Sequence, residues 1–195
     1  SGYLSDKRAS ITSESLSRQF IQRIKKPRVR QLVGKLLCPV SLEPSMVNMV
    51  LEAWYGPSLL PDKKDELTNF VDMVESLMEI LPSNYHLAIC VCKQLTRTST
   101  PANAPSGVSF WGTALLISAL FQAVPVAPEY VWVEAADILH DLTGSQSLSI
   151  SFLKRALPIY PFSIMLWKTY INLSEAEGNS DSVKEAARGK GIKLQ

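Results

Sequence analysis

The sequence is poor in the residue types that carry most enzyme chemistry. It has only two histidines and three cysteines among 195 residues. His86 and His140 each stand alone on an expected helix, with no second ligand or nucleophile at a useful spacing. A glycine-rich phosphate loop, a G-x-S-x-G elbow and an H-E-x-x-H helix are also missing. We therefore predict that the protein is not an enzyme and binds no cofactor.

The cysteines are too few and too irregular for a disulfide framework. Cys90 and Cys92 are separated by one residue, which on a helix sends the side chains to different faces, unlike the two-residue spacing of zinc knuckles. The sequence also shows no secretory leader. We expect free, buried thiols in a reducing compartment and no metal site.

Charge is absent from one long stretch, residues 98–128, whose inner part VSFWGTALLISALFQAV could be taken for a membrane span. Ser109, Thr113, Ser118 and Gln122 interrupt it, and basic flanks are lacking. These features favour a central helix that is covered on most sides, and we expect no membrane contact.

Charge elsewhere is segregated along the chain. Residues 1–36 hold nine Lys or Arg against Asp6 and Glu14, a net charge of +7, whereas the remainder has a net charge of −5. Two helices are expected here, over 13–24 and 29–37, separated by Pro27. We interpret residues 1–37 as a basic arm that packs on the body. The arm's basic side chains could form a solvated helix surface, which we favour, or bind RNA or an acidic partner; the central ones are Arg23, Lys25, Lys26, Arg28 and Arg30.

Proline-stiffened corners organise the rest of the chain. An apolar stripe over 152–157 predicts a helix that ends at Pro158 and Pro161, because proline lacks the amide donor and clashes with the preceding turn. A second helical face follows, and Gly178 closes it. The residues assigned to that face are Met165, Leu166, Trp167, Tyr170, Ile171 and Leu173.

The corner is repeated 33 residues earlier. Gln122 to Pro128 matches Arg155 to Pro161 as x-Ala-aliphatic-Pro-aliphatic-x-Pro, and a fainter copy lies at 79–82. Trp132 and Trp167 follow their corners at similar offsets, which predicts that both are core residues. A period in the mid-thirties is typical of helix-pair solenoids. We predict an all-α domain over 38–195, built of stacked antiparallel helix pairs with corners near 79–82, 122–128 and 155–161.

Two further helices complete the pattern. Amphipathic spacing predicts one over 62–81 and another over 85–95. A capping box, Ser182 to Glu185, is expected to open a last helix with Val183, Ala186 and Ala187 turned inward.

The second corner resembles the half-a-tetratricopeptide (HAT) repeat family, a relative of the TPR repeat. The resemblance rests on Arg155-Ala156-Leu157-x-x-x-Pro161 and Trp167-x-x-Tyr170, with Pro158 inside the corner, and on Pro125, Pro128 and Trp132 in the earlier copy. One position departs from the family pattern, since Ser174 stands where an acidic residue is usual. HAT repeats are typical of RNA-processing scaffolds, so the resemblance implies a scaffold with a groove that grips a peptide or helix.

The run from Leu36 to Pro61 also resembles the C-terminal region of the zinc-finger C3H1 domain-containing scaffolds of the nuclear poly(A)-tail exosome-targeting complex, although their zinc-finger part is absent here. This resemblance implies a nuclear adaptor in RNA decay whose partners are an exosome RNA helicase and a nuclear poly(A)-binding protein. Tyr55 and Tyr130 are the tyrosines most expected to be exposed for a partner. RNA binding by the arm and homodimerisation remain the alternatives.

Overall fold

The computed structural model describes residues 64–98 and 106–194. Within these ranges the chain forms seven α-helices and no strand, which confirms the predicted all-α class. The basic arm, the helices expected before residue 62, and Cys38, Trp54 and Tyr55 lie outside the described residues. Contacts divide the chain into two units, Ser1–Pro82 and Ser83–Gln195.

The described part of the first unit is helix α4, Lys64–Ile80. Its buried side chains recur at helical spacing, as the sequence pattern predicts: Phe70, Met73, Val74, Leu77 and Met78. Asp72, Glu75 and Glu79 are exposed on the other side. The helix is therefore amphipathic.

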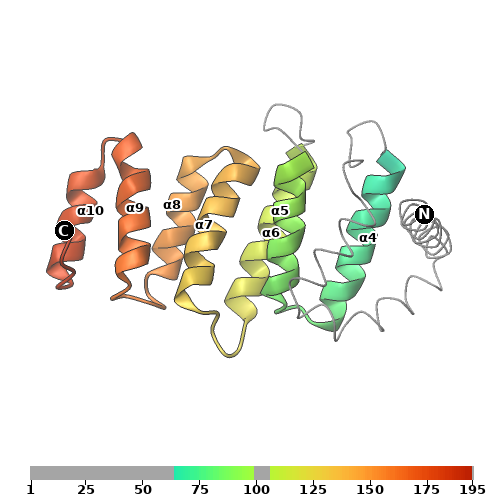
Figure 1. The fold of residues 1–195 in the computed structure, drawn as a ribbon, viewed down its shortest axis with the longest axis horizontal. Helices are drawn as coiled ribbons and strands as arrows, with labels where there is room; N and C mark the ends of the chain where they lie inside the picture. The colour runs from blue at the N-terminus through green and yellow to red at the C-terminus, as the bar shows by residue number, and fades with distance from the viewer. Residues whose placement is uncertain (1–63, 99–105, 195) are drawn as a thin grey trace, which may run out of the picture. The chain divides into compact units, whose positions relative to one another are not determined.

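The second unit contains the other six helices. They are α5 Tyr85–Thr98, α6 Ser106–Gln122, α7 Glu129–Thr143, α8 Gln146–Ala156, α9 Ile164–Ala176 and α10 Ser180–Gly189. Successive helices run in opposite directions, so that α5, α7 and α9 begin at the end of the unit where α6, α8 and α10 finish (Figure 1).

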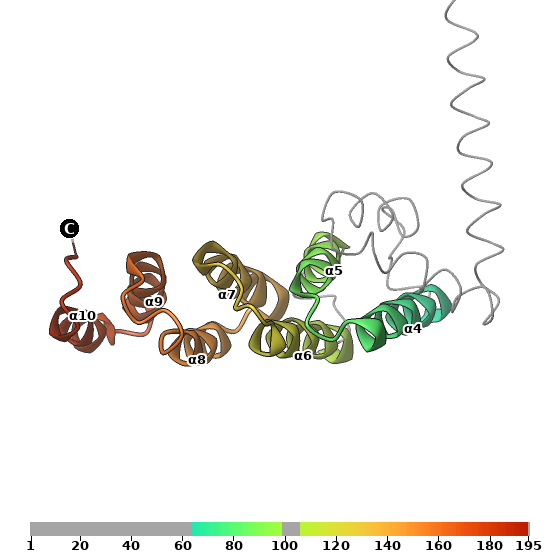
Figure 2. The same ribbon diagram turned by 90° about the horizontal axis from the view of Figure 1, so that it is seen from below.

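Helix contacts in the second unit are made between neighbours and next neighbours. Each helix packs on the one that follows it, and α7 also packs on both α5 and α9. Seen from below, α5, α7 and α9 lie in one layer and α6, α8 and α10 in the other (Figure 2). Lys93 of α5 and Glu134 of α7 form an ion pair within the first layer. Both side chains are partly exposed, so this pair adds little stability.

The core between the layers is centred on Trp132, whose side chain is 0% exposed. The Phe152 ring stacks against it at 5.8 Å between centroids, and the Phe121 ring meets it edge-on at 5.1 Å. Such offset and edge contacts are the arrangements that the ring quadrupoles favour. The three aromatic residues come from α7, α8 and α6, so one cluster joins three consecutive helices.

Helix boundaries follow from local capping. The Asn84, Ser145 and Ser163 side chains accept hydrogen bonds from the backbone N–H groups of Leu87, Leu148 and Leu166, at 3.1, 3.3 and 3.1 Å. These bonds satisfy donors that have no partner inside the helix. At the other end of α7, Gly144 takes the left-handed conformation, with φ of 63°, and closes the helix.

The last helix corrects two predictions. Helix α10 begins at Ser180, two residues before the proposed capping box, because its N-cap is Asn179. The Ser182 hydroxyl donates backward to the Asn179 carbonyl at 3.0 Å, a bond made inside the helix. Val183 and Ala187 are buried as expected, but Ala186 is exposed.

Helix α6 accounts for the uncharged stretch. Its inner side includes Gly112, Leu116 and Leu120, which are buried, while Phe110, Ala114 and Ser118 are exposed. Across residues 64–98 and 106–194, no helix combines the length and apolar character needed to cross a membrane.

Candidate interaction surface

Two connections, over 123–128 and 157–163, lie at the same end of the second unit and share one hydrogen-bonding device. The Trp132 indole N–H donates to the carbonyl of Ala127 at 3.0 Å. The Trp167 indole N–H donates to the carbonyl of Pro161 at 2.9 Å. In each case a tryptophan in the first or second turn of a helix bonds back to the connection before that helix. The bond satisfies a polar group on a side chain that is otherwise buried in the core.

The two connections are also bonded to each other. The Tyr160 hydroxyl donates to the Ala127 carbonyl at 2.7 Å, so that one acceptor serves Tyr160 and Trp132 together. The Ser163 hydroxyl donates to the carboxylate of Glu129 while its oxygen caps α9. These bonds fix the connection before α9 against the first turn of α7.

Large apolar side chains are exposed along this end of the unit. Eight such residues are exposed in the described part of the chain, and six of them lie in these two connections or in the first turn of the helix that follows. The six are Val124, Val126, Tyr130, Phe162, Ile164 and Met165. We call this set the corner edge. Exposed apolar residues that gather in one place indicate an interaction site, whereas single ones do not.

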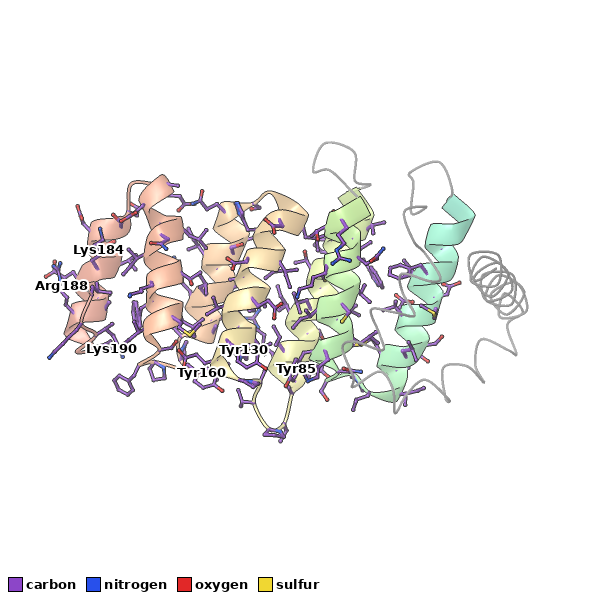
Figure 3. All side chains as sticks on the ribbon, viewed as in Figure 1. Tyr85, Tyr130, Tyr160, Lys184, Arg188 and Lys190 are labelled. Atoms are coloured by element: carbon purple, nitrogen blue, oxygen red, sulfur yellow. The ribbon has the colours of Figure 1, made fainter. Side chains whose placement is uncertain are left out.

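Three tyrosines lie near one another at the same end. Tyr85, Tyr130 and Tyr160 come from the start of α5, the start of α7 and the second connection (Figure 3). Burial is the main cause that raises the pKa of Tyr85 above its ordinary value, and the neighbouring Tyr130 and Tyr160 raise it further. The Tyr85 phenol is therefore neutral at pH 7, and the three rings supply aromatic surface at this end.

The sequence-predicted signature residues divide between core and surface. Trp132, Ala156, Leu157 and Trp167 are buried, as expected for core positions. Pro125, Pro128, Arg155 and Pro158 are exposed, while Pro161 and Tyr170 are half-buried. Tyr170 lies beside Trp167, with 6.2 Å between the ring centroids. The Arg155 guanidinium lies over the Phe121 ring, 4.2 Å from its centroid, so this arginine covers the aromatic cluster from outside.

Of the predicted partner-binding residues, Tyr130 is described, and it is 59% exposed. Arg23, Lys25, Lys26, Arg28, Arg30 and Tyr55 lie outside the described residues. The structure therefore brings Tyr130 together with a set of residues that the sequence reasoning did not select. One of these surface residues could have been found from the sequence. Phe162 is a bulky apolar residue that lies in a connection, between Pro161 and Ser163.

Met165 was assigned to the inner face of α9, and this assignment is wrong because its side chain is 47% exposed. The buried residues of α9 are Leu166, Trp167, Ile171 and Ser174. Met165 and Ile164 lie at the edge of that stripe, where the helix has just begun. They extend the corner edge from Phe162 onto α9.

Cysteine chemistry is suppressed in the described part of the chain. Cys90 and Cys92 are buried thiols outside any disulfide, as predicted. The Cys92 thiol donates to the carbonyl of Gly112 at 3.2 Å. Burial raises the pKa of the Cys90 thiol to about 11 and that of Cys92 to about 12. In residues 64–98 and 106–194, no group of three or more His, Cys, Asp or Glu side chains could hold a metal ion.

These raised values predict slow thiol labelling. At pH 8 the thiolate fraction of Cys90 falls roughly 100-fold below that of a thiol with its ordinary pKa, and only the thiolate reacts. We expect Cys90 and Cys92 to resist maleimide in the folded protein and to react fully in denaturant. Peptide mapping by mass spectrometry identifies each labelled site. Fast labelling of Cys92 in the folded state would contradict its burial.

Comparison with known proteins gives no relative from which a family could be assigned. The chain matches no family model, no curated protein and no solved structure.

Proposed function

We propose that the chain is a non-catalytic protein-interaction scaffold, built as a short HAT/TPR-like solenoid of antiparallel helix pairs. The corner edge carries this proposal, because six of the eight exposed large apolar residues in the described part of the chain lie on two adjacent connections or in the first turn of the helix after each. The solenoid is supported by the contacts between neighbouring and next-neighbouring helices. It is supported further by the matching indole bonds of Trp132 and Trp167.

The partners that we propose are nuclear. The sequence resemblance over Leu36 to Pro61, together with the HAT-like second corner, favours an adaptor in nuclear RNA processing and exosome-mediated decay. The proposed partners are an exosome RNA helicase and a nuclear poly(A)-binding protein. Partner binding through apolar side chains would depend weakly on salt, because few counterions are released.

The alternative function is RNA binding by the basic arm, which the net charge of +7 on residues 1–36 favours. RNA binding would weaken steeply with salt as counterions are released from the phosphates. Homodimerisation is the third possibility, and light scattering measures it directly.

The experiment compares these functions on the full chain. The immobilised chain is offered purified exosome helicase, purified nuclear poly(A)-binding protein and labelled single-stranded RNA, each at two salt concentrations. We expect one of the two proteins to bind at both concentrations. A matched variant replaces Arg23, Lys25, Lys26, Arg28 and Arg30 by glutamine and should keep protein binding. If only RNA binds, and the glutamine variant abolishes this, the arm is an RNA module and the adaptor proposal is wrong.

A further inference from the structure

Charge in the second unit is segregated between the two ends of its helices. At the end that carries the corner edge, the described charged residues are Lys154, Arg155, Lys168, Arg188 and Lys190 against Glu129, counting histidine as neutral. At the opposite end they are Arg97 and Lys184 against Asp141, Glu175, Glu177 and Asp181, and Lys184 is paired with Glu175 at 3.0 Å. The net charge is +4 at the corner-edge end and −2 at the opposite end, so the corner-edge end favours acidic ligands.

Glu129, the acidic residue at this end, already accepts a hydrogen bond. The Glu129 carboxylate accepts a hydrogen bond from Ser163, which directs it into the contact between the two connections. Glu129 therefore competes little for the cations around it. The basic side chains are exposed, and Lys190 lies at the same end of the unit as Tyr130 and Tyr160 (Figure 3).

Basic side chains lie beside apolar ones at this end. Ile164 and Lys168 lie one helical turn apart on α9, with Met165 beside them, and all three are exposed. Helix α10, which packs on α9, adds Arg188 and Lys190 on one side. The connection 123–128 adds Val124, which is 92% exposed, on the other. A ligand lying along the edge would meet cations and apolar surface in turn.

The apolar residues are mostly aliphatic, which favours a peptide over RNA. Four of the six corner-edge residues, Val124, Val126, Ile164 and Met165, have no ring on which a base could stack, and stacking supplies much of the affinity of single-stranded RNA sites. Tyr130 and Phe162 are the two with exposed rings. Aliphatic side chains gain binding energy by covering the side chains of another protein. A second copy fits less well, because Phe110 on α6 is the one exposed large apolar residue that the structure describes at the acidic end of the unit.

We propose that the corner edge binds a peptide segment in which Asp or Glu alternates with bulky aliphatic or aromatic residues. This inference rests on the proposed scaffold function and names the partner class. Phe162, Ile164 and Met165 would contact the apolar residues of the segment, and Lys168, Arg188 and Lys190 its carboxylates.

The test measures fluorescence anisotropy of a labelled synthetic peptide, in which Asp and Glu alternate with Leu and Phe, on the full chain. A second peptide carries Lys at every acidic position, and a labelled oligoadenylate is the third ligand. We expect the acidic peptide to bind at least about tenfold more tightly than the basic peptide. Absence of acidic-peptide binding, or tighter binding of the RNA, would overturn the proposal.

Two pairs of matched variants locate the site. Phe162→Ala combined with Met165→Ala should weaken peptide binding about tenfold or more, because truncating central apolar anchors has the largest effects. Phe110→Ala removes an equally exposed ring, 75% against 71%, at the other end of the unit and should change nothing. Arg188→Glu should weaken binding several-fold, whereas Arg97→Glu, also in the last turn of its helix, should not. Equal effects within either pair would refute the corner edge as the site.

Failure of this inference can be told apart from failure of the proposed function. If a nuclear partner protein binds equally to the chain and to the Phe162→Ala, Met165→Ala variant, the scaffold stands and the corner edge is not its docking site. If the acidic peptide binds as described but neither nuclear protein does, the docking surface stands and the nuclear assignment falls. If the corner edge holds a second copy, light scattering will show a dimer that the double variant dissociates, which would also overturn the peptide proposal.

Discussion

Replacing Trp132 by alanine will lower the free energy of unfolding of the second unit by about 4 kcal/mol. The side chain is fully buried and packs on the Phe121 and Phe152 rings, so its removal leaves a cavity in the aromatic cluster. The Ala127 carbonyl also loses the hydrogen bond from Trp132 and keeps the one from Tyr160. Because a domain is stable by only about 5–15 kcal/mol, this single change removes a large share of its stability.

Urea denaturation followed by circular dichroism measures the effect. Trp132→Phe keeps an aromatic ring in the cluster and loses the indole bond, so it should cost roughly 2 kcal/mol. Tyr130→Ala, two residues away on the same helix but exposed, should cost about 0.5 kcal/mol or less. A Trp132→Ala variant as stable as Tyr130→Ala would show that the aromatic cluster does not hold α6, α7 and α8 together.

The second large effect is expected at Gly112, where α6 comes close to its neighbours. A Cβ atom added there would lie 3.0 Å from Leu95 Cδ1 and 3.2 Å from Leu142 Cδ2. These atoms belong to α5 and α7, and a small side chain can be accommodated if they turn aside. A leucine cannot, so Gly112→Leu should destabilise the unit by about 3 kcal/mol through overpacking.

The same helix supplies the control for Gly112→Leu. Gly107 has no atom within 4 Å of an added Cβ and is exposed. Gly107→Leu should therefore stabilise the protein by about 0.5 kcal/mol, because leucine favours the helix more than glycine. Thermal melting of both variants should give shifts of opposite sign. Two shifts of the same size and sign would mean that the close approach of α6 to α5 and α7 is wrong.

The helical class could be predicted from residues whose effects are local. Proline at 125, 128, 158 and 161 and glycine at 144 restrict the backbone of their own segment, and the structure has connections or helix ends at those positions. The prediction that a capping box at Ser182 opens the last helix failed. A capping box is recognised by residue types alone, and these do not show where the chain turns. Gly178 with φ of 76° and the bond from Asn179 N–H to the Ser174 carbonyl turn the chain early, and α10 begins at once.

The candidate surface could not be predicted in the same way. Met165 was assigned to the inner face, and Ile164 was given no role, because the direction of α9 and the depth of its buried stripe are not visible in the sequence. The charge segregation depends on successive helices being antiparallel, which brings Arg155 and Arg188 to one end although they are distant in sequence. Both features come from packing, whereas the corners come from local backbone restriction.

The Ala127 carbonyl has a consequence for any ligand that spans both connections. Trp132 holds this oxygen from its own helix, and Tyr160 reaches it from the next connection, 33 residues along the chain. These two hydrogen bonds tie the connection that carries Val126 to the connection that carries Phe162. A peptide of the proposed kind that contacts both connections should therefore bind less tightly when one residue is inserted between its two anchors.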